Sequence, residues 1–325
     1  MLDQNKTQAL IPVSERDSLR KALVKMKARR NGDLKSLKTA WQSFNDAFCD
    51  GLEWRTITVV GARPGTGKTL FMEQLVNDTI DLNKDQKFRV LKFQFEMLDE
   101  TNGIRKLSMN VNADYNTLMS KDKPIDKNLF QKCVDVYEKT VDTDIIDVVY
   151  DPCTIEDLVA TVTYYMQKNK EADIFTNTLI TIDHSTLFKL SKQFKDKFDM
   201  LYGLGEALTQ LKKKFPIAFL VLSQLNRNVE HPDRAKDGQY GNYVLDSDLY
   251  GSDALLQHAD VVIGINRPYS RRIKFYGPER YIVNDENLLV FHYLKSRNSV
   301  TGMNFFKLDR DLVRIVEIDA PPTSK

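Results

Sequence analysis

A short glycine-rich run with a lysine and a threonine has the residue types and the spacing needed to hold phosphate. Residues 61–69 read Gly-Ala-Arg-Pro-Gly-Thr-Gly-Lys-Thr. The glycines let backbone N–H groups turn toward a polyphosphate, Lys68 supplies an ammonium for its terminal phosphates, and the Thr69 hydroxyl suits Mg²⁺. The candidate phosphate-binding residues are Ala62, Arg63, Pro64, Gly65, Thr66, Gly67, Lys68, Thr69 and Leu70. The run therefore predicts a site for ATP and Mg²⁺.

The sequence on either side of this run supports a P-loop. Residues 56–60 form an apolar stretch typical of a buried strand, and residues 70–76 have the pattern of a helix. A strand, a glycine-rich turn and a helix N-terminus together form a phosphate-binding arrangement. The strict motif places its first glycine at position 62, where this chain has Ala62 directly after Gly61. The alternative is an ordinary strand–turn–helix unit that carries Gly-Lys-Thr by chance, and the flanking elements favour the P-loop.

Three polar residues follow or end predicted strands in an order that suits nucleotide hydrolysis. Glu96 follows an alternating stretch, Asp183 ends the buried stretch 178–183, and Gln224 follows the apolar stretch 217–222. Asp183 is suited to hold Mg²⁺ together with Thr69, Glu96 to polarise an attacking water, and Gln224 to sense a γ-phosphate. Each residue alone is more typical of a helix cap or a solvated loop. Behind a P-loop, the three together predict a catalytic site.

The elements that must position these residues alternate between strands and helices. Strand patterns occur at 56–60, 88–95, 144–150, 178–183, 217–222 and 261–265, and helix patterns at about 154–168 and 197–214. Further short strands at 288–294, 303–308 and 312–318 indicate β-hairpins near the end of the chain, and residues 99–140 are mostly helical. The pattern predicts an α/β fold with a mostly parallel sheet, whose chemistry gathers at the carboxyl ends of its strands.

Composition limits the class of protein. The chain has 325 residues, of which 42% are hydrophobic and 28% charged, as in soluble globular proteins. Its three cysteines are far apart and odd in number, which argues against a disulfide framework or a zinc site. There is no apolar run near the roughly 18 residues that span a membrane and no secretory signal at the start. We expect a cytoplasmic protein without a membrane partner.

The first 36 residues form a basic arm ahead of the predicted ATPase domain at 37–325. Residues 1–30 contain eight Lys/Arg and three Asp/Glu, a net charge of +5, which leaves −3 for the rest of a chain of net charge +2. Ser14 begins a capping pattern, and an apolar stripe at helical spacing predicts a helix over 14–31. A solvated face or an anionic partner accounts equally for the charge. So narrow a stripe suits docking onto a neighbouring subunit.

Five stretches resemble the ATPase domain of DnaB-type replicative helicases, in the order found in that family of the RecA-fold superfamily. These are residues 61–69, Gln-Phe-Glu-Met at 94–97, Thr-Ile-Asp at 181–183, Ser-Gln-Leu-Asn-Arg at 223–227, and a segment over 248–260. The resemblance extends from about residue 37 to the C-terminus. It implies a RecA-like P-loop NTPase core in which Glu96 is the general base and Asp183 the Walker B carboxylate. His184 stands where the family usually has another aromatic residue.

The resemblance also gives a role to the sequence Lys-Ser-Arg-Asn at 295–298. In the family, such a sequence lies on a β-hairpin and reaches the nucleotide of the neighbouring subunit. Residues two apart on a strand face the same way, so Lys295 and Arg297 are expected to point together at a γ-phosphate. Read alone, two cations on an edge strand are more often a device that keeps the protein soluble.

One departure concerns the predicted contact with DNA. Residues 227–253 form a long polar loop, and Tyr-Gly-Ser-Asp-Ala at 250–254 replaces the Arg-Glu-Ser-Gly-Ser with which the family contacts single-stranded DNA. Candidates to replace that contact by charge and base stacking are Arg234, Lys236, Tyr240, Tyr243 and Tyr250. A solvated loop without such a role is the alternative.

These features predict an ATP-dependent replicative DNA helicase that translocates on single-stranded DNA as a ring, expected to be hexameric, and unwinds the duplex. Because only the 1–36 arm precedes the ATPase domain, we expect a compact version with a primase or a helicase loader as partner. Two alternatives come from other classes: a RecA-fold recombinase that forms filaments, and a loader-type ATPase that remodels a protein partner.

Overall fold

A computed structural model provides the fold and describes residues 11–171, 177–235, 242–249, 251–298, 300–310 and 313–324. The chain divides into two compact units, Met1–Ser36 and Leu37–Lys325. Lys236, Tyr240 and Tyr250, three of the predicted DNA contacts, lie outside the described residues.

The first unit contains the helix α1 (Glu15–Asn31). The Ser14 side chain accepts a hydrogen bond from the backbone N–H of Asp17, and Gly32 ends the helix with a φ of 78°. These caps agree with the predicted helix 14–31 and its start at Ser14. Within its unit, α1 buries no residue, and the leucines of its apolar stripe are exposed.

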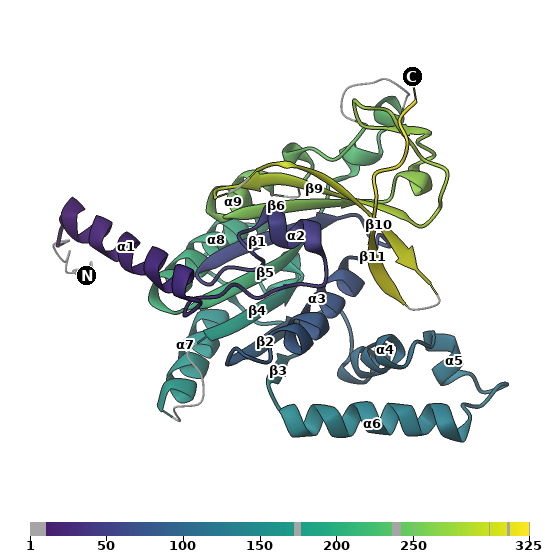
Figure 1. Ribbon diagram of the computed structural model, residues 1–325, viewed down its shortest axis with the longest axis horizontal. Helices are drawn as coiled ribbons and strands as arrows, with labels where there is room; N and C mark the ends of the chain where they lie inside the picture. Colours follow the sequence, from purple (N-terminus) through teal and green to yellow (C-terminus); the bar gives the residue numbers. More distant parts are fainter. Residues whose placement is uncertain are drawn as a thin grey trace. The chain divides into compact units, whose positions relative to one another are not determined.

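A nine-stranded sheet organises the described part of the second unit, in the order β11-β10-β9-β6-β1-β5-β4-β2-β3 (Figure 1). The strands from β6 to β3 are parallel, and β9, β10 and β11 continue the sheet in antiparallel fashion. The parallel strands are β1 (Thr56–Ala62), β2 (Phe88–Gln94), β3 (Ile146–Val149), β4 (Asn177–Asp183), β5 (Ile217–Gln224) and β6 (Val261–Asn266). The others are β7 (Phe275–Tyr276) and β8 (Tyr281–Ile282), which pair with each other, and β9 (Leu288–Ser296), β10 (Gly302–Asp309) and β11 (Arg314–Ile318).

Helices connect the parallel strands. The α-helices are α2 (Gln42–Ala47), α3 (Lys68–Leu82), α4 (Asp99–Val111), α5 (Tyr115–Met119), α6 (Lys127–Thr143), α7 (Ile155–Glu171), α8 (Lys197–Lys214) and α9 (Ser252–His258). Short 3-10 helices occur at Ser185–Leu187, Arg227–Glu230, Pro232–Ala235, Asp246–Asp248 and Pro268–Arg271. Within its described residues, the predicted 227–253 loop therefore contains three 3-10 turns and the beginning of α9.

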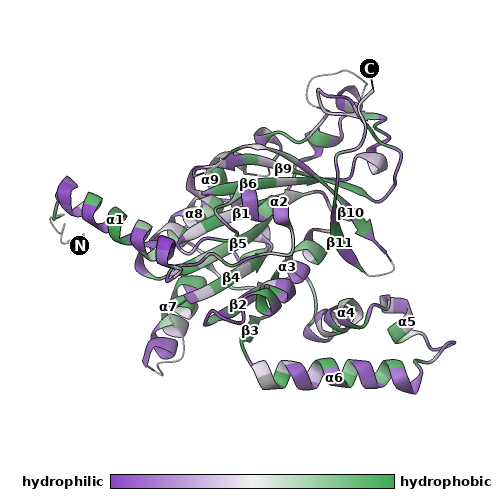
Figure 2. Ribbon diagram, in the orientation of Figure 1, coloured by the Kyte–Doolittle hydropathy of each residue, from purple (hydrophilic) through white to green (hydrophobic). Residues whose placement is uncertain are grey.

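Each face of the sheet has its own apolar core, because alternate side chains of a strand point to opposite faces. Val59 of β1 joins a core with residues of α7 and α8, whereas its neighbour Val60 joins a core with residues of α3. Apart from the edge strand β3, the parallel strands are largely buried on both sides, and Figure 2 shows green, the colour of hydrophobic residues, along them. Burial on both faces explains why these strands are continuous apolar runs in the sequence.

An aromatic cluster ties the start of the second unit to the sheet. The ring of Trp41 stacks on Phe71 of α3 at 5.0 Å and meets Phe291 of β9 and Phe306 of β10 edge-on. The Trp41 indole N–H donates to the backbone carbonyl of Ile315 at 3.0 Å. The segment before β1 is therefore held against the helix that carries the Gly-Lys-Thr run.

The α/β fold with a mostly parallel sheet and C-terminal antiparallel strands is confirmed. In the part of the chain that the structure describes, no helix is both long and apolar enough to span a membrane.

Candidate active site

The glycine-rich run lies where β1 meets α3, at the carboxyl edge of the parallel sheet. Ala62 is the last residue of β1, and the glycine before it is required by packing. A Cβ at Gly61 would lie 2.7 Å from Leu249 and 2.9 Å from Leu225. Ala62 is buried without such a conflict. The glycine at position 61 therefore lets β1 pack closely against the leucines of two neighbouring segments.

The turn itself uses backbone conformations that favour glycine. Gly65 has a φ of 76° and Gly67 a φ of 99°, values that side-chain-bearing residues rarely adopt. Gly67 then caps α3, whose first residue is Lys68. Burial lowers the pKa of the Lys68 ammonium, while the carboxylates of Asp183 and Glu96 act in the opposite direction. Lys68 is thus the first residue of a helix and lies near the carboxylates of Asp183 and Glu96.

The Arg63 side chain connects this turn to β5 and the segment after it. Its guanidinium donates to the carbonyl of Leu225 at 3.0 Å and to the Glu230 carboxylate at 2.9 Å. This ion pair lowers the pKa of Glu230. The Arg63 side chain therefore holds the turn to the segment that follows β5.

Thr69 and Asp183 are brought together as the sequence predicts. The Thr69 hydroxyl donates to Oδ2 of Asp183 at 3.0 Å. The other oxygen, Oδ1, is buried, and no hydrogen-bond donor among the described residues reaches it. A hydroxyl and a carboxylate with an unsatisfied buried oxygen form a set of hard oxygen donors, which fits Mg²⁺. Burial also raises the pKa of Asp183 to about 6, and Lys68 and Thr69 oppose that rise.

Glu96 lies at the same edge of the sheet. Gln94 is the residue of β2 that pairs with Asp183 of β4, and the N–H of Phe95 donates to the carbonyl of Asp183 at 3.1 Å. This backbone hydrogen bond fixes the position of the chain directly before Glu96, whose side chain is exposed. The Glu96 carboxylate is exposed, whereas that of Asp183 is buried. Glu96 is therefore accessible to a water molecule.

Gln224 has a partner that the sequence did not reveal. Its side-chain nitrogen lies 3.2 Å from Nε2 of His184, and Nδ1 of that ring lies 2.9 Å from the Thr186 hydroxyl. Burial lowers the pKa of His184 to about 4, and the nearby cations Lys68 and Lys197 add to this effect. The ring is therefore neutral near pH 7. The one signal in the sequence was a histidine directly after the strand-ending carboxylate.

A buried charge network beside α3 was also not predicted from the sequence. Glu73 of α3 accepts from Lys92 at 2.7 Å and also from the Gln94 side chain. All three side chains are buried, and a buried charge needs a partner. Burial lowers the pKa of Lys106 on α4, and the neighbouring Lys92 cation adds to this effect. A lysine between two apolar residues of a strand, as at position 92, is the signal that predicts such a partner.

Lys295 and Arg297 point the same way, but the partners present are in their own chain. The Lys295 ammonium donates to the carbonyl of Leu256, and Arg297 donates to the carbonyl of Gln257 at 2.8 Å. Both carbonyls belong to the last turn of α9, where cations are favourable. Arg297 also lies 3.8 Å from the Asp260 carboxylate and keeps about half of its side chain exposed. The two cations are therefore held together at the end of β9, beside the beginning of β6.

Two of the predicted DNA contacts have structural roles inside the loop. Arg234 binds both oxygens of Asp248, one of them at 2.9 Å, and donates to the carbonyl of Tyr243 at 2.7 Å. The Asp248 carboxylate is 2% exposed, so the pair is shielded from water. The Tyr243 ring stacks on His292 of β9. These contacts occupy the Arg234 guanidinium and the Tyr243 ring, which the sequence alone assigned to phosphate and bases.

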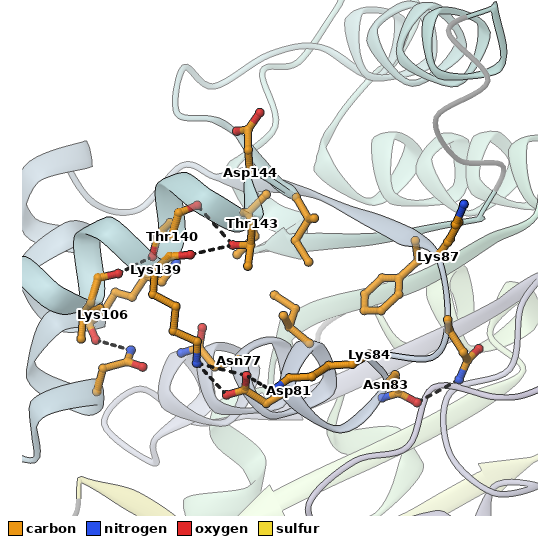
Figure 3. A pocket seen from close by; sticks show the side chains of 17 residues that line it. Asn77, Asp81, Asn83, Lys84, Lys87, Lys106, Lys139, Thr140, Thr143 and Asp144 are labelled. Carbon is orange, nitrogen blue, oxygen red and sulfur yellow. Dashed lines mark hydrogen bonds and ion pairs between the residues drawn. The ribbon is translucent and has the colours of Figure 1, made fainter.

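A groove lies elsewhere in the second unit (Figure 3). It has a volume of about 700 Å³ and lies among α3, α4, α6 and the beginnings of β2 and β3. Lys139 of α6 meets Asp81 of α3 across it at 3.2 Å. Lys84 and Lys87 lie in the loop beside it. Since it is at the amino ends of the strands, this groove is separate from the edge that carries Lys68 and Asp183.

Comparison with known proteins gives a consistent result. Residues 15–315 match the family described as the DnaB-like helicase C terminal domain. The chain is 27% identical over 245 residues to the replicative DNA helicase DnaB of Mycoplasma pneumoniae, a match that spans 72% of this chain and 47% of that protein. It is 26% identical over 233 residues to the replicative DNA helicase DnaB of Helicobacter pylori, which spans 69% and 42%.

Solved structures agree at the level of fold. One, of a DnaB-like replicative helicase and its interactions with primase, is similar over 95% of this chain and 68% of that chain, with a TM-score of 0.75 and 16% identity. A separately solved ATPase domain is similar over 95% of this chain and its own full length, with a TM-score of 0.77 and 16% identity. The chain spans slightly less than half the length of the two curated relatives it matches.

Proposed function

The chain belongs to the DnaB-like helicase C-terminal domain family, and from that premise we propose that it is an ATP-driven motor that unwinds DNA. The observation that carries the proposal is the placement of the Gly-Lys-Thr turn, the Thr69–Asp183 pair and Gln224 on one edge of a RecA-like sheet. Its two curated relatives above are replicative DNA helicases. The activity of the whole protein is part of the proposal.

In the proposed reaction, each residue at the sheet edge acts on ATP or on the attacking water. The turn and Lys68 hold the phosphates, so negative charge that develops on the transferred phosphoryl group is stabilised by a cation already in place. Glu96 accepts a proton from the water that attacks the γ-phosphate. Gln224 donates a hydrogen bond to the same phosphate. Thr69 and Asp183 would hold Mg²⁺, which neutralises phosphate charge when bound.

We place a second part of the site on the neighbouring subunit of a ring, expected to be hexameric. Lys295 and Arg297 are already side by side, and the exposed half of Arg297 gives it the reach to act outside its own chain. A guanidinium that arrives from a neighbour couples hydrolysis to the interface between subunits. The helix α1, whose apolar stripe is exposed, would pack on an adjacent subunit.

Single-stranded DNA is the proposed track, and the 227–253 loop its contact. Arg234 and Asp248 hold the loop together, so we assign direct phosphate contact to Lys236 and base stacking to Tyr240 and Tyr250. A primase or a helicase loader is the proposed protein partner, in line with the primase named for one of the similar structures.

The assay that tests this proposal is ATP hydrolysis with and without single-stranded DNA. A DNA-driven motor is expected to hydrolyse ATP several-fold faster when DNA is present. An unchanged rate would favour the loader-type ATPase that remodels a protein. Electron microscopy of the DNA-bound protein separates the remaining alternative, because a recombinase is expected to form open filaments and a helicase closed rings.

Replacing Lys68 by alanine is expected to reduce ATP turnover below a tenth of the wild-type rate while the protein still folds. The ammonium is the only side-chain cation of the phosphate turn besides Arg63, whose guanidinium is bound to Leu225 and Glu230. Turnover is measured by phosphate release and folding by circular dichroism. Lys87→Ala, in the groove at the other end of the strands, is the matched control and should keep full turnover. Retention of more than a tenth of the activity in Lys68→Ala would refute the P-loop assignment.

Replacing Lys236 by alanine is expected to flatten the salt dependence of single-stranded DNA binding. Each phosphate contact releases counterions, so the slope of log K against log salt falls by about 0.7 per lost contact on a single strand. Fluorescence anisotropy at several salt concentrations gives the slope. Lys84→Ala removes one exposed charge far from the loop and should leave the slope as it is. If both variants behave alike, Lys236 does not contact the DNA phosphates.

A further inference from the structure

The Gln224 side chain is held by a chain of hydrogen bonds that ends on a threonine. Its nitrogen is 3.2 Å from Nε2 of His184, and Nδ1 of that imidazole is 2.9 Å from the Thr186 hydroxyl. His184 follows the last residue of β4, Thr186 lies in the 3-10 helix Ser185–Leu187, and Gln224 ends the adjacent strand β5. Two strand ends are thereby joined through one buried ring, which is 5% exposed.

The donor and acceptor roles in this chain follow from the groups involved. An amide nitrogen carries two hydrogens and cannot accept, so Nε2 of His184 must be the acceptor. A neutral imidazole has one hydrogen, which then lies on Nδ1 and is donated to the Thr186 oxygen. Gln224 keeps a second amide hydrogen that the ring does not use. The bond to His184 restricts the direction of that hydrogen, because it limits how the amide can rotate.

We propose that His184 is a positioning residue for Gln224, and that it holds the second amide hydrogen toward the terminal phosphate of the bound nucleotide. The inference rests on the proposed function, since it needs Gln224 to meet that phosphate. A glutamine side chain has three rotatable bonds, and a free one loses that freedom each time it meets the transition state. The hydrogen bond to His184 restricts the Gln224 side chain before the nucleotide binds, so less conformational freedom is lost in the transition state. The hydrogen bond to Thr186 keeps the imidazole ring from rotating.

The first test compares variants at positions 184 and 224. His184→Phe keeps a buried ring but offers no acceptor, and we expect kcat to fall about tenfold. This is less than the 10²- to 10³-fold loss that typically follows removal of a whole transition-state donor. Binding of a fluorescent ATP analogue should change less than about twofold. His184→Gln returns an acceptor near the Nε2 position and should recover most of kcat. A purely structural role for the ring would not distinguish between these two variants.

The double variant shows whether the two residues act as one unit. If His184 works only through Gln224, His184→Phe should cause no further loss in a Gln224→Ala background. If the losses of kcat in the two single variants multiply in the double variant, the proposal is overturned. Full activity of His184→Phe, or failure of His184→Gln to recover kcat, would overturn it as well. Wild-type kcat in Gln224→Ala would overturn it too, and would leave the ATPase itself established. Thr186→Val removes only the hydroxyl that holds the His184 ring. It replaces His184→Phe in the test if that variant does not fold, and it should lower kcat about threefold.

A second measurement does not depend on ATP hydrolysis. The chain has four histidines, and the imidazole signals of His184 in a nitrogen NMR spectrum are those lost in His184→Phe. They should show hydrogen on Nδ1 in the wild type and a shift in both Gln224→Ala and Thr186→Val. Hydrogen on Nε2, or no shift in either variant, would overturn the proposal. If the wild type hydrolyses no ATP, the proposed function fails, and the NMR result still decides whether His184 holds Gln224.

Discussion

Glu96→Gln is expected to bind ATP with wild-type affinity and to hydrolyse it about 10²- to 10⁴-fold more slowly, the range for loss of a general acid or base. The amide keeps the size of the side chain but cannot take a proton from water. Glu96 is exposed at the end of β2, and its backbone is fixed by the bond from Phe95 to Asp183. The substitution therefore leaves the P-loop and the Thr69–Asp183 pair as they are.

Nucleotide binding and hydrolysis must be measured separately on this variant. Equilibrium titration with a fluorescent ATP analogue gives the affinity, and single-turnover phosphate release gives the chemical step. Glu100→Gln, an exposed carboxylate in the first turn of α4, is the matched control and should be as active as the wild type. Loss of nucleotide binding in Glu96→Gln would mean that Glu96 supports the fold of the site and that the base is another residue.

Much of the fold could be predicted because the sheet is mostly parallel and its central parallel strands are buried on both faces. Such strands are unbroken apolar runs, as at residues 178–183 and 217–222, and each has a polar residue where the chain leaves the core. Helix α8 was predicted with the bounds it has in the structure, Lys197–Lys214. The order of these elements leaves few topologies, because parallel strands need crossover helices.

The contacts between side chains could not be predicted in the same way, since they depend on register and on neighbours far apart in sequence. The bond between His184 and Gln224 joins residues 40 positions apart, and the bond between Glu73 and Lys92 depends on how α3 lies on β2. Arg234 shows the same limit. An arginine in a polar loop suggests a phosphate contact, and the sequence does not show that the acidic residue 14 positions later binds it within the fold.

Arg297→Ala is expected to lower ATP hydrolysis about 10³-fold or more, the scale of a lost arginine finger, with nucleotide binding nearly intact. Among the contacts described, the Arg297 guanidinium meets the carbonyl of Gln257 and the Asp260 carboxylate of its own chain. The guanidinium is half exposed, so these interactions contribute little to stability, and the melting temperature should change by no more than a few degrees. Arg310→Ala, which loses an exposed pair with Glu286, is the control for the removal of a surface arginine.

Mixing two inactive variants tests whether Arg297 acts on the neighbour. Lys68→Ala lacks the phosphate cation and Arg297→Ala lacks the finger, so each ring alone has only defective sites. Where a Lys68→Ala subunit supplies its finger to the P-loop of an Arg297→Ala subunit, one complete site is rebuilt. Partial activity should therefore return on mixing, while a mixture of Lys68→Ala with Lys68→Ala/Arg297→Ala should stay inactive.

The same logic predicts how wild-type rings respond to the defective finger. Because each Arg297→Ala subunit disables the site of its neighbour, activity should fall with the fraction of variant even when every wild-type subunit has an intact P-loop. If firing also requires adjacent sites to be intact, the fall is steeper than linear. Native mass spectrometry must show that mixed rings form. With mixed rings present, a strictly linear titration together with no recovery on mixing would place Arg297 in its own subunit's site and refute the interface mechanism.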